Sequence, residues 1–362
     1  MFGTVQSVYY PNNLVNPFIE PEKTTSYEVG LSTAFAKNRI NIEATYFHNK
    51  DENQIINLPI SEASGFTSRL INGNIYTTNG FEIMIGAIPI SNSKIRWNSN
   101  FNFSGQSRIL SEIYDNQKKY GNLKVGDRAD ALYATVWQKN ATGQLILDSK
   151  GMPIRDPYPH FVGNQLPDYL YGWQNSLEFD GFRINIDFDG AIGGTLISTT
   201  HQKMWWAGKH PKSTTWRDAE YEQKKPVYVP EGVVVTGGEL KRDIDGNVIS
   251  DTRTFAPNKT AVNWQSWSQN YPYRAVVLVE ESEEFANTFD TSFLKLRRLA
   301  VTYDVNRFLK WPGINAIDLT LFGNNLFVLK NIPYLDPDFG SKDNDLQDPS
   351  ARYIGVNASI KF

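Results

Sequence analysis

The sequence predicts an all-β fold, an antiparallel transmembrane β-barrel to which this chain contributes about nine strands. Three observations predict this fold class. Nine segments of the 362-residue chain alternate apolar and polar residues with a period of two. Short and long connections alternate between these segments, and the last segment ends the chain on an aromatic side chain, Phe362. Helical periodicity is absent almost everywhere, so strands are expected to build the domain.

The nine predicted strands are bounded by turn residues and have the pattern of half-buried strands. They cover residues 25–35, 39–49, 79–89, 94–104, 169–179, 182–192, 292–303, 315–323 and 353–362. The pattern is clearest at 182–189, where apolar and polar residues alternate without a break: Phe182, Arg183, Ile184, Asn185, Ile186, Asp187, Phe188 and Asp189. Because successive side chains of a strand point to opposite faces, each strand should have one apolar and one polar face.

The connections between these strands are alternately short and long. The short ones cover residues 36–38, 91–94, 180–181 and about eleven residues around Trp311, whereas the long ones cover about 50–78, 105–168, 193–291 and 324–352. The Asp-Gly pair at 180–181 is the strongest two-residue hairpin signal. Transmembrane barrels have short periplasmic turns and long extracellular loops. Loops beyond about 12–15 residues are uncommon in compact soluble domains, so the alternation favours the barrel over a soluble sandwich.

In a barrel the apolar face of each strand would contact lipid, and aromatic side chains near the strand ends would lie at the membrane interfaces. The predicted lipid-facing residues include Ile40, Ile42, Phe101, Phe103, Ile184, Ile186, Leu319, Leu321, Val356 and Ile360. The predicted interfacial aromatic residues include Phe35, Phe179, Tyr303 and Phe362.

The last strand has the length of a tilted membrane-spanning strand, about 9–11 residues. Its apolar parity consists of Ile354, Val356, Ala358 and Ile360, and the chain ends on Phe362. A terminal strand that ends on an aromatic residue resembles the assembly signal of bacterial outer-membrane barrels. Taken alone, the pattern also fits an edge strand of a soluble sandwich.

The polarity of the strands predicts that the sheet does not close by itself. The first and ninth strands run in the same direction, and their free edges would not be tolerated in lipid. The N-terminus also lacks the charged and apolar regions of a secretory signal. We therefore expect residues 1–362 to be the C-terminal part of a larger barrel domain, with the missing strands encoded before Met1.

Composition argues against several other classes of protein. The formal charge is −3, and no basic block indicates a nucleic-acid surface. The chain has no cysteine, so it has neither disulfide bonds nor thiolate chemistry. Its four histidines and its carboxylates fall into no nucleophile–base, zinc or P-loop spacing. No catalytic residue is predicted, and the protein is not expected to be an enzyme.

A series of motifs resembles the SusC/RagA-type TonB-dependent outer-membrane receptors of Bacteroidota. The most specific ones lie at 290–297, with the sequence DTSFLKLR, and at 323–327, with GNNLF, and the segment DPD at 336–338 follows them. Weaker ones lie at 21–24, 27–31, 53–56, 58–60, 64–65, 72–75, 79–82, 126–128, 132–133, 163–164, 167–168 and 193–194. Arg298 stands where the family usually has an acid and Asn324 where it usually has a base. The order and spacing of the motifs, more than any single one, carry the resemblance.

The resemblance implies a bacterial outer-membrane location and a 22-strand barrel filled by an N-terminal plug. It implies energised import of oligosaccharides, or of peptides in some members, through a TonB-contacting N-terminal region. A SusD-like lipoprotein would be the partner, and dimers of receptor–lipoprotein pairs are a further implied arrangement. Two alternatives stay open: a TonB-dependent receptor for another cargo such as a siderophore, and a soluble β-rich carbohydrate-binding protein or glycosidase.

The long connection 193–291 holds five of the nine tryptophans, which is unusual for a solvated loop. They are Trp205, Trp206, Trp216, Trp264 and Trp267. Flat aromatic rings suit the faces of sugars and also anchor protein interfaces. We predict that these residues contact ligand or partner, with Trp205 and Trp206 the first candidates for sugar contact. The alternative is that they pack the loop against itself or against the lipoprotein.

No cofactor is predicted, although two acidic segments were weighed as calcium sites. The segment 243–247 begins like an EF-hand loop, but Thr254 stands where that loop needs an acid, so a turn between two short strands is expected. The last long connection carries Asp336, Asp338, Asp343, Asp345 and Asp348. These residues could hold Ca²⁺ in an extracellular loop, but a solvated acidic loop is the prediction.

Overall fold

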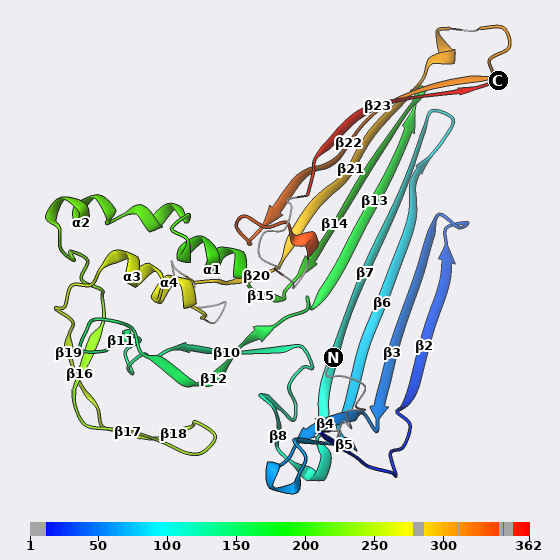
Figure 1. Ribbon diagram of the computed structural model, residues 1–362. Coiled ribbons are helices and arrows are strands. Elements are labelled where there is room, and N and C mark those ends of the chain that lie inside the picture. The colour runs from blue at the N-terminus through cyan, green and yellow to red at the C-terminus, as the bar shows by residue number, and fades with distance from the viewer. Residues whose placement is uncertain (1–11, 278–285, 310, 340–342, 344–349) are drawn as a thin grey trace, which may run out of the picture. The chain divides into compact units, whose positions relative to one another are not determined.

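The computed structural model describes residues 12–277, 286–309, 311–339, 343 and 350–362. Nine long strands form one sheet in the order of the sequence (Figure 1). They are β2 (Lys23–Phe35), β3 (Ile40–Glu52), β6 (Ile75–Ser91), β7 (Ile95–Glu112), β13 (Tyr169–Phe179), β14 (Phe182–Ile192), β21 (Phe293–Asp304), β22 (Ala316–Lys330) and β23 (Tyr353–Lys361). All nine predicted strands are therefore confirmed, and β2 and β23 are the first and last strands of the order.

The chain divides into two units. The first comprises residues up to Ala34, Asn41–Met84 and Ser104–Ala129, and the second comprises Phe35–Ile40, Ile85–Phe103 and Asp130–Phe362. Beyond the long strands, the first unit contains a small sheet in which β5 (Ser68–Asn72) pairs with β1 (Asn13–Val15) and β4 (Ile55–Pro59). Its other elements are η1 (Glu62–Ser64), η2 (Tyr114–Asn116), β8 (Lys119–Tyr120) and β9 (Leu123–Lys124).

The last five strands of the sheet pair antiparallel in a register that keeps apolar and polar residues on separate faces. One row of directly opposed residues is apolar across all five strands: Leu177, Ile184, Val301, Leu321 and Val356. The adjacent row, one residue along each strand and therefore on the other face, is polar throughout: Glu178, Arg183, Thr302, Thr320 and Asn357. Opposed residues of an antiparallel pair lie on the same face, so the wall has the two faces that its period-two sequence predicts.

The turn that joins β13 to β14 shows why those two strands have the predicted bounds. Asp180 and Gly181 have φ angles of 43° and 81°. Two consecutive residues with positive φ are the signature of the type I′ hairpin, whose twist matches that of the flanking strands. Gly181 adopts this conformation without the steric cost of a Cβ atom.

Some strands extend beyond the predicted ends, and a bulge accounts for the extension of β22 to Lys330. The pairing of β21 with β22 shifts register between Leu296 and Arg298, opposite the segment from Asn324 to Phe327. Asn325 in this segment has a φ angle of 54°. A bulge breaks the alternation by one residue, so the periodicity ends near Gly323 although the strand continues to Lys330.

The long connections of the second unit are not bare loops. The described parts of residues 131–164 and 195–290 fold together, and we call them the loop domain. Its strands are β10 (Ala131–Trp137), β11 (Ile146–Leu147), β12 (Arg155–Asn164), β15 (Thr195–Ile197), β16 (Val233–Gly237), β17 (Leu240–Arg242), β18 (Val248–Asp251), β19 (Thr254–Pro257) and β20 (Thr288–Asp290). Its helices are α1 (Thr199–Trp206), η3 (Pro211–Thr214), α2 (Arg217–Gln223), α3 (Trp264–Ser268) and α4 (Tyr271–Arg274). These α-helices have four to eight residues, too few for a helical period to show in the sequence.

The remaining short helices are η5 (Val305–Arg307) and η6 (Pro337–Phe339). In the part of the chain that the structure describes, no helix has both the length and the apolar character needed to cross a membrane.

Candidate functional site

Three of the five predicted contact tryptophans form the core of the loop domain. Trp205, Trp264 and Trp267 are 0%, 3% and 2% exposed. They pack in one cluster with Trp137 and Leu147, which come from the long connection 105–168. Each of these three side chains is covered by the loop domain itself and is not exposed to a ligand or partner in this structure, and a contact of the three with either stays a prediction. The alternative, packing of the loop against itself, holds for them.

Trp206 and Trp216 remain on the surface. Trp206 is 53% exposed and Trp216 is 37% exposed. Trp205 and Trp206 are adjacent, but successive residues of a helix point about 100° apart, so α1 buries one indole and presents the other. For Trp206 and Trp216 the role in ligand or partner contact stays a prediction.

A pocket of about 530 Å³ lies beside Trp206 on the loop domain. Its wall includes Tyr221 of α2, which is 75% exposed, and the side chains of Arg217, Gln265 and Gln269. Two exposed aromatic rings together with guanidinium and amide groups make a wall that can both stack on a flat ligand and hydrogen-bond to it.

Hydrogen bonds between the helices give this pocket its shape. The carboxylate of Glu220, on α2, accepts hydrogen bonds from the backbone N–H of Trp264 at 2.7 Å and from Nδ2 of Asn263 at 2.9 Å. Asn263 in turn caps α3, because its Oδ1 accepts from the N–H of Ser266 at 3.0 Å. The side chain of Gln269 donates to the carbonyl of Trp206 at 3.1 Å. These bonds fix α1, α2 and α3 around the pocket.

Two buried histidines, His201 of α1 and His210 at the start of η3, lie next to each other. His201 is held by Asn287, whose Oδ1 lies 2.7 Å from Nδ1 of the imidazole. The amide of Asn287 donates to the carbonyls of Pro272 and Ala275, at 2.7 and 2.8 Å, so its oxygen must face His201 and His201 must carry a proton on Nδ1. This contact ties α1 to the segment that leads into β20.

His210 stacks on Trp205 with ring centroids 4.0 Å apart, and it lies 5.0 Å from the ring of His201. Burial, together with smaller electrostatic effects of His201 and Lys212, lowers the pKa of His210 to about 4. Burial also lowers the pKa of His201, against the opposing effect of the hydrogen bond to Asn287. Both imidazoles are therefore neutral at pH 7.

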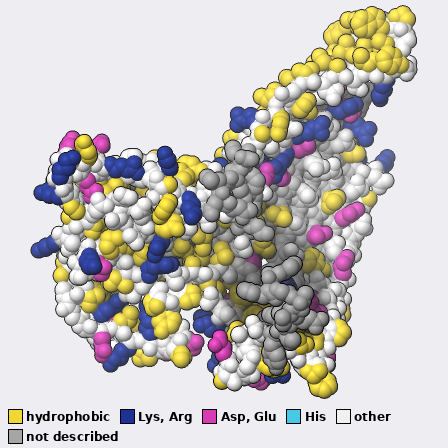
Figure 2. Space-filling model, in the orientation of Figure 1, with side chains coloured by type: hydrophobic (Ala, Val, Ile, Leu, Met, Phe, Trp, Pro, Cys, Tyr) yellow, Lys and Arg dark blue, Asp and Glu magenta, His cyan; other side chains and the backbone are white. Residues whose placement is uncertain are grey.

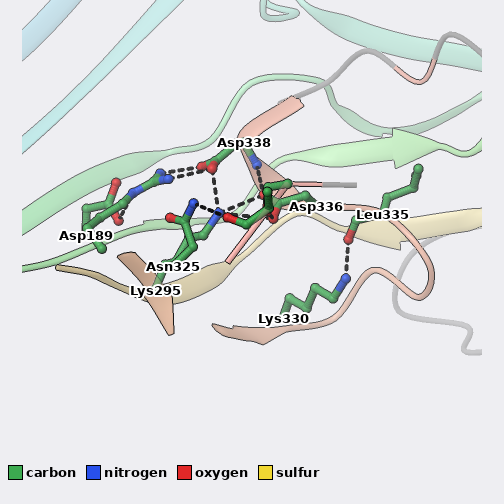
Figure 3. Close-up of polar contacts among 10 residues, drawn as sticks. Asp189, Lys295, Asn325, Lys330, Leu335, Asp336 and Asp338 are labelled. Atoms are coloured by element: carbon green, nitrogen blue, oxygen red, sulfur yellow. Dashed lines mark hydrogen bonds and ion pairs between the residues drawn. The ribbon is translucent and has the colours of Figure 1, made fainter. Parts of the chain in front are cut away.

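The last long connection is fastened to the wall by a buried ionic cluster, shown in Figure 3. Lys295 of β21 is 1% exposed, and its Nζ lies 3.0 Å from both carboxylate oxygens of Asp336 and 2.5 Å from Oδ2 of Asp338. Arg297, two residues along β21, also pairs with Asp338 and donates from Nε to Asp189 of β14 at 2.7 Å. Burial alone would raise the pKa of Asp338, but hydrogen bonds from Arg297 and Lys295 outweigh it and hold the pKa at about 2.

The same connection also reaches the loop domain through Asp343. Its carboxylate accepts hydrogen bonds from the hydroxyl of Ser198 at 2.6 Å, the N–H of Thr200 at 2.8 Å and the hydroxyl of Thr200 at 2.6 Å. A carboxylate at this position satisfies the free N–H groups of the first turn of α1 and complements the helix dipole.

The sequence already contained the two halves of the ionic cluster, but not their pairing. The segment 290–297 is one of the most specific motifs and 336–338 follows it along the chain, and Lys295 and Arg297 of the first meet Asp336 and Asp338 of the second. Two cations at i and i+2 of a strand opposite two acids at i and i+2 of a later loop form a signal that sequence reasoning can search for. The buried histidine pair had no such signal, because the spacing of His201 and His210 matches no recognised motif.

The acidic segments show no metal centre in the described residues. No group of three or more His, Cys, Asp or Glu side chains gathers in that part of the chain. Asp336, Asp338 and Asp343 are engaged as described above, and Asp345 and Asp348 lie outside the described residues. The segment from Asp243 to Asn247 is the turn between β17 and β18, as predicted.

The predicted assembly residues of the last strand lie on one face of β23. Ile354, Val356, Ala358 and Ile360 are opposed to alternate residues of β22, beginning with Gly323 and ending with Ile317. Ile354, Val356, Ile360 and Phe362 are all exposed. Figure 2 shows hydrophobic side chains gathered at the end of the sheet where the chain terminates, marked C in Figure 1. Their role in barrel assembly stays a prediction.

The chain is similar to known proteins along nearly all of its length. A family model described as TonB dependent receptor-like, beta-barrel matches residues 2–326. The TonB-dependent receptor P3 of Formosa agariphila is 20% identical, over 95% of this chain and 33% of that receptor. The TonB-dependent receptor P39 of the same organism is also 20% identical, over 98% of this chain and 37% of that receptor. The chain thus spans about a third of the length of these relatives.

Solved structures agree in fold. The RagAB peptide transporter matches with a TM-score of 0.58 at 17% identity, over 94% of this chain and 35% of that chain. The RagAB peptide importer in its open-open state matches with a TM-score of 0.60 at 16% identity, over 95% of this chain and 35% of that chain. At these identities the likeness is one of fold.

Proposed function

The chain belongs to the family of TonB-dependent receptor-like β-barrels, and we propose that it forms wall strands and extracellular loops of an importer in the bacterial outer membrane. The predicted family and fold class are thereby confirmed. The proposed cargo is an oligosaccharide or a peptide, and the proposed energy source is TonB, acting through an N-terminal region of the receptor. Because the chain spans about a third of its relatives, transport is proposed for the whole receptor and not for this chain alone.

The observation that carries the proposal is the two-faced wall with a folded loop domain at one of its ends. The apolar row from Leu177 to Val356 suits lipid, because lipid-facing and lumen-facing residues alternate in barrel strands. The connections at the other end of each strand are short, as periplasmic turns are. A large outer domain with its own tryptophan core is the part of the protein that an extracellular ligand or partner would meet first.

A SusD-like lipoprotein is the proposed partner. The motifs at 290–297 and 336–338 support this, since they carry the resemblance to SusC/RagA-type receptors and build the ionic cluster of the last loop. The exposed Trp206 and Trp216 are candidates for contact with that partner or with cargo. The likeness in fold to the RagAB peptide importer supports a peptide as one candidate cargo, and the resemblance to SusC/RagA-type receptors supports an oligosaccharide as the other.

The test uses the full-length receptor in its own host. We expect the receptor to fractionate with the outer membrane and to take up a labelled oligosaccharide or peptide pool only when TonB is present. Co-purification in detergent should bring down a lipoprotein encoded beside it. Recovery of a detergent-independent, soluble monomer would contradict the membrane assignment, and uptake that persists without TonB would contradict the energised mechanism.

A further inference from the structure

A cationic surface lies on the loop domain along α1, η3 and α2. Residues 199–225 contain six Lys or Arg and three Asp or Glu, a formal charge of 6 − 3 = +3, in a chain whose total is −3. The six cations are all exposed: Lys203, Lys209, Lys212, Arg217, Lys224 and Lys225. Figure 2 shows Lys and Arg side chains over α2. Residues 199–225 thus form a local surface of net positive charge on the loop domain.

Within the part of the chain that the structure describes, most of this charge is not neutralised by carboxylates. Arg217 donates to two backbone carbonyls, of Gly208 at 2.9 Å and of Ser213 at 3.0 Å. Lys224 places its Nζ 3.7 Å from the ring centroid of Tyr221. Lys203 and Lys209 form no ion pair with a described carboxylate. Glu220, one of the three acids in the segment, is already committed to the N–H of Trp264.

The pocket of about 530 Å³ opens within this surface and adds aromatic and amide groups to the charge. Trp206 and Tyr221 present exposed rings, and Gln265 and Gln269 present side-chain amides. Large aromatic side chains that a folded domain leaves exposed beside a pocket mark a binding site. Ring faces stack on the flat C–H faces of sugars, while amides hydrogen-bond to hydroxyl groups.

The wall of the pocket also contains a buried polar group in need of a partner. Ser268 is 4% exposed and lines the pocket, and its hydroxyl has no hydrogen-bond partner among the described residues. Buried hydroxyls are normally satisfied. A ligand hydroxyl or a water that enters with the ligand would satisfy this one.

We propose that this pocket binds an anionic oligosaccharide, one whose sugar rings carry carboxylate or sulfate groups. The inference rests on the proposed function and names the class of cargo. A neutral oligosaccharide would use the two aromatic rings but leave the exposed cations without a role. An acidic peptide would match the charge but offers few flat apolar faces to Trp206 and Tyr221. Sugars that carry anionic groups use both features at once.

The test is calorimetric binding to the full-length receptor, with three hexasaccharide probes. Hexagalacturonate carries carboxylates, a heparin-derived hexasaccharide carries sulfates as well, and maltohexaose carries no charge. We expect at least one anionic probe to bind about tenfold more tightly than maltohexaose. Raising the salt concentration from about 0.05 to 0.5 M should weaken that binding, because exposed charges are screened at high ionic strength.

Matched variants locate the site. Trp206→Ala should weaken binding of the anionic probe about tenfold, whereas Trp311→Ala, at an exposed tryptophan in the β21–β22 connection, should leave it unchanged. The triple change of Lys203, Lys209 and Lys224 to Gln should weaken it to a similar extent. A control that neutralises the exposed Lys37, Lys94 and Lys361 removes the same charge elsewhere and should have no effect.

Each contrary result overturns the inference. It fails if all three probes bind equally, if none binds, or if Trp206→Ala is silent. It also fails if the triple Lys variant keeps its affinity for the anionic probes but no longer retains the lipoprotein, because the surface would then be a protein interface. TonB-dependent uptake of a peptide or neutral sugar with no affinity for the anionic probes would overturn this inference while leaving the proposed function intact.

Discussion

At the scale of single residues, Lys295 is the most deeply buried Lys or Arg side chain in the part of the chain that the structure describes. Its ammonium group is buried and lies between two carboxylates, so removal of the cation would leave Asp336 and Asp338 facing each other in a partly buried site. Loss of one partner of a buried ion pair typically costs about 3–5 kcal/mol.

We therefore expect Lys295→Ala to release the last loop from the wall. In the full-length receptor in detergent, protease should cut the 331–352 segment faster, and the thermal midpoint should fall. Lys361→Ala, which removes an exposed lysine of β23, serves as the control and should behave like the wild type. Equal cleavage rates for the two variants would show that the cluster does not hold the loop.

The two buried histidines make the stability of the loop domain depend on pH. The folded-state pKa of His210 is about 4 and that of an unfolded histidine about 6.5. A histidine with a lowered folded pKa is protonated first in the unfolded state, so its contribution to stability is complete above pH 6.5 and is lost as the pH falls from 6.5 toward 4.

Tryptophan fluorescence can follow this loss, because His210 stacks on Trp205. We expect the thermal midpoint of the loop domain to decrease between pH 7 and pH 4.5. The variant His210→Asn keeps a side chain able to cap η3 but removes the titrating group, and its midpoint should vary less over the same range. A wild-type midpoint that is flat from pH 7 to 4.5 would contradict the assignment of neutral, buried imidazoles.

Residue-scale predictions from sequence failed where burial depends on distant partners. Trp205 and Trp206 are adjacent and chemically identical, yet one is core and the other surface. What covers Trp205 is a cluster that includes Trp137 and Leu147, more than 50 residues earlier in the chain. The local sequence pattern carries no information about contacts with such distant residues. The sequence therefore shows that the loop is rich in tryptophan but not which tryptophans are buried and which are exposed.

At the scale of elements, the strands could be predicted because their signals are local. Alternation with a period of two and an Asp-Gly turn predict β13 and β14 to the residue. Prediction stopped at the bulge near Asn325, where one extra residue inverts the alternation. The helices of the loop domain were missed because one or two turns of helix leave no periodic trace.

The face assignment of β23 yields a prediction with an internal control. Val356 lies in the apolar row and Asn357, the next residue, lies in the polar row. An arginine on the lipid face near the bilayer midplane costs about 2–4 kcal/mol, whereas lumen-facing positions tolerate charge.

Val356→Arg should therefore reduce the amount of full-length receptor assembled in the outer membrane, while Asn357→Arg should leave it near the wild-type level. The measurement is the heat-modifiable, folded band of the receptor in outer-membrane fractions. A loss for Asn357→Arg alone would mean that the lipid-facing and lumen-facing sides of β23 have been exchanged. Similar losses for both variants would mean that β23 does not face lipid.

At the scale of the whole second unit, the last long connection joins the wall to the loop domain. Asp336 and Asp338 bind cations on β21, and Asp343, five residues beyond Asp338, binds the first turn of α1. The sequence offered these acids only as a cluster. It could not show that these acids bind two different parts of the protein, because their partners lie 41 or more residues earlier in the chain. The alternation of short and long connections, by contrast, is a property of the chain's order and could be read directly.

The last long connection binds the wall through Asp336 and Asp338 and binds α1 through Asp343, and this leads to a prediction about coupling between the loop domain and the wall. Asp343 accepts three hydrogen bonds from Ser198 and Thr200, so Asp343→Ala leaves the start of α1 without its carboxylate cap. Replacing a capping group costs about 0.5–2 kcal/mol, which corresponds to an increase of about twofold to about thirtyfold in local opening. We expect faster amide hydrogen exchange in α1 and unchanged exchange in β21 and β22, whereas Lys295→Ala should affect β21 and the last loop.

If the connection transmits cargo binding from the loop domain to the wall, Asp343→Ala should also slow TonB-dependent uptake at a normal surface level of receptor. Unchanged exchange in α1 would show that the cap is not formed, and faster exchange with normal uptake would show that the contact is structural and takes no part in transport.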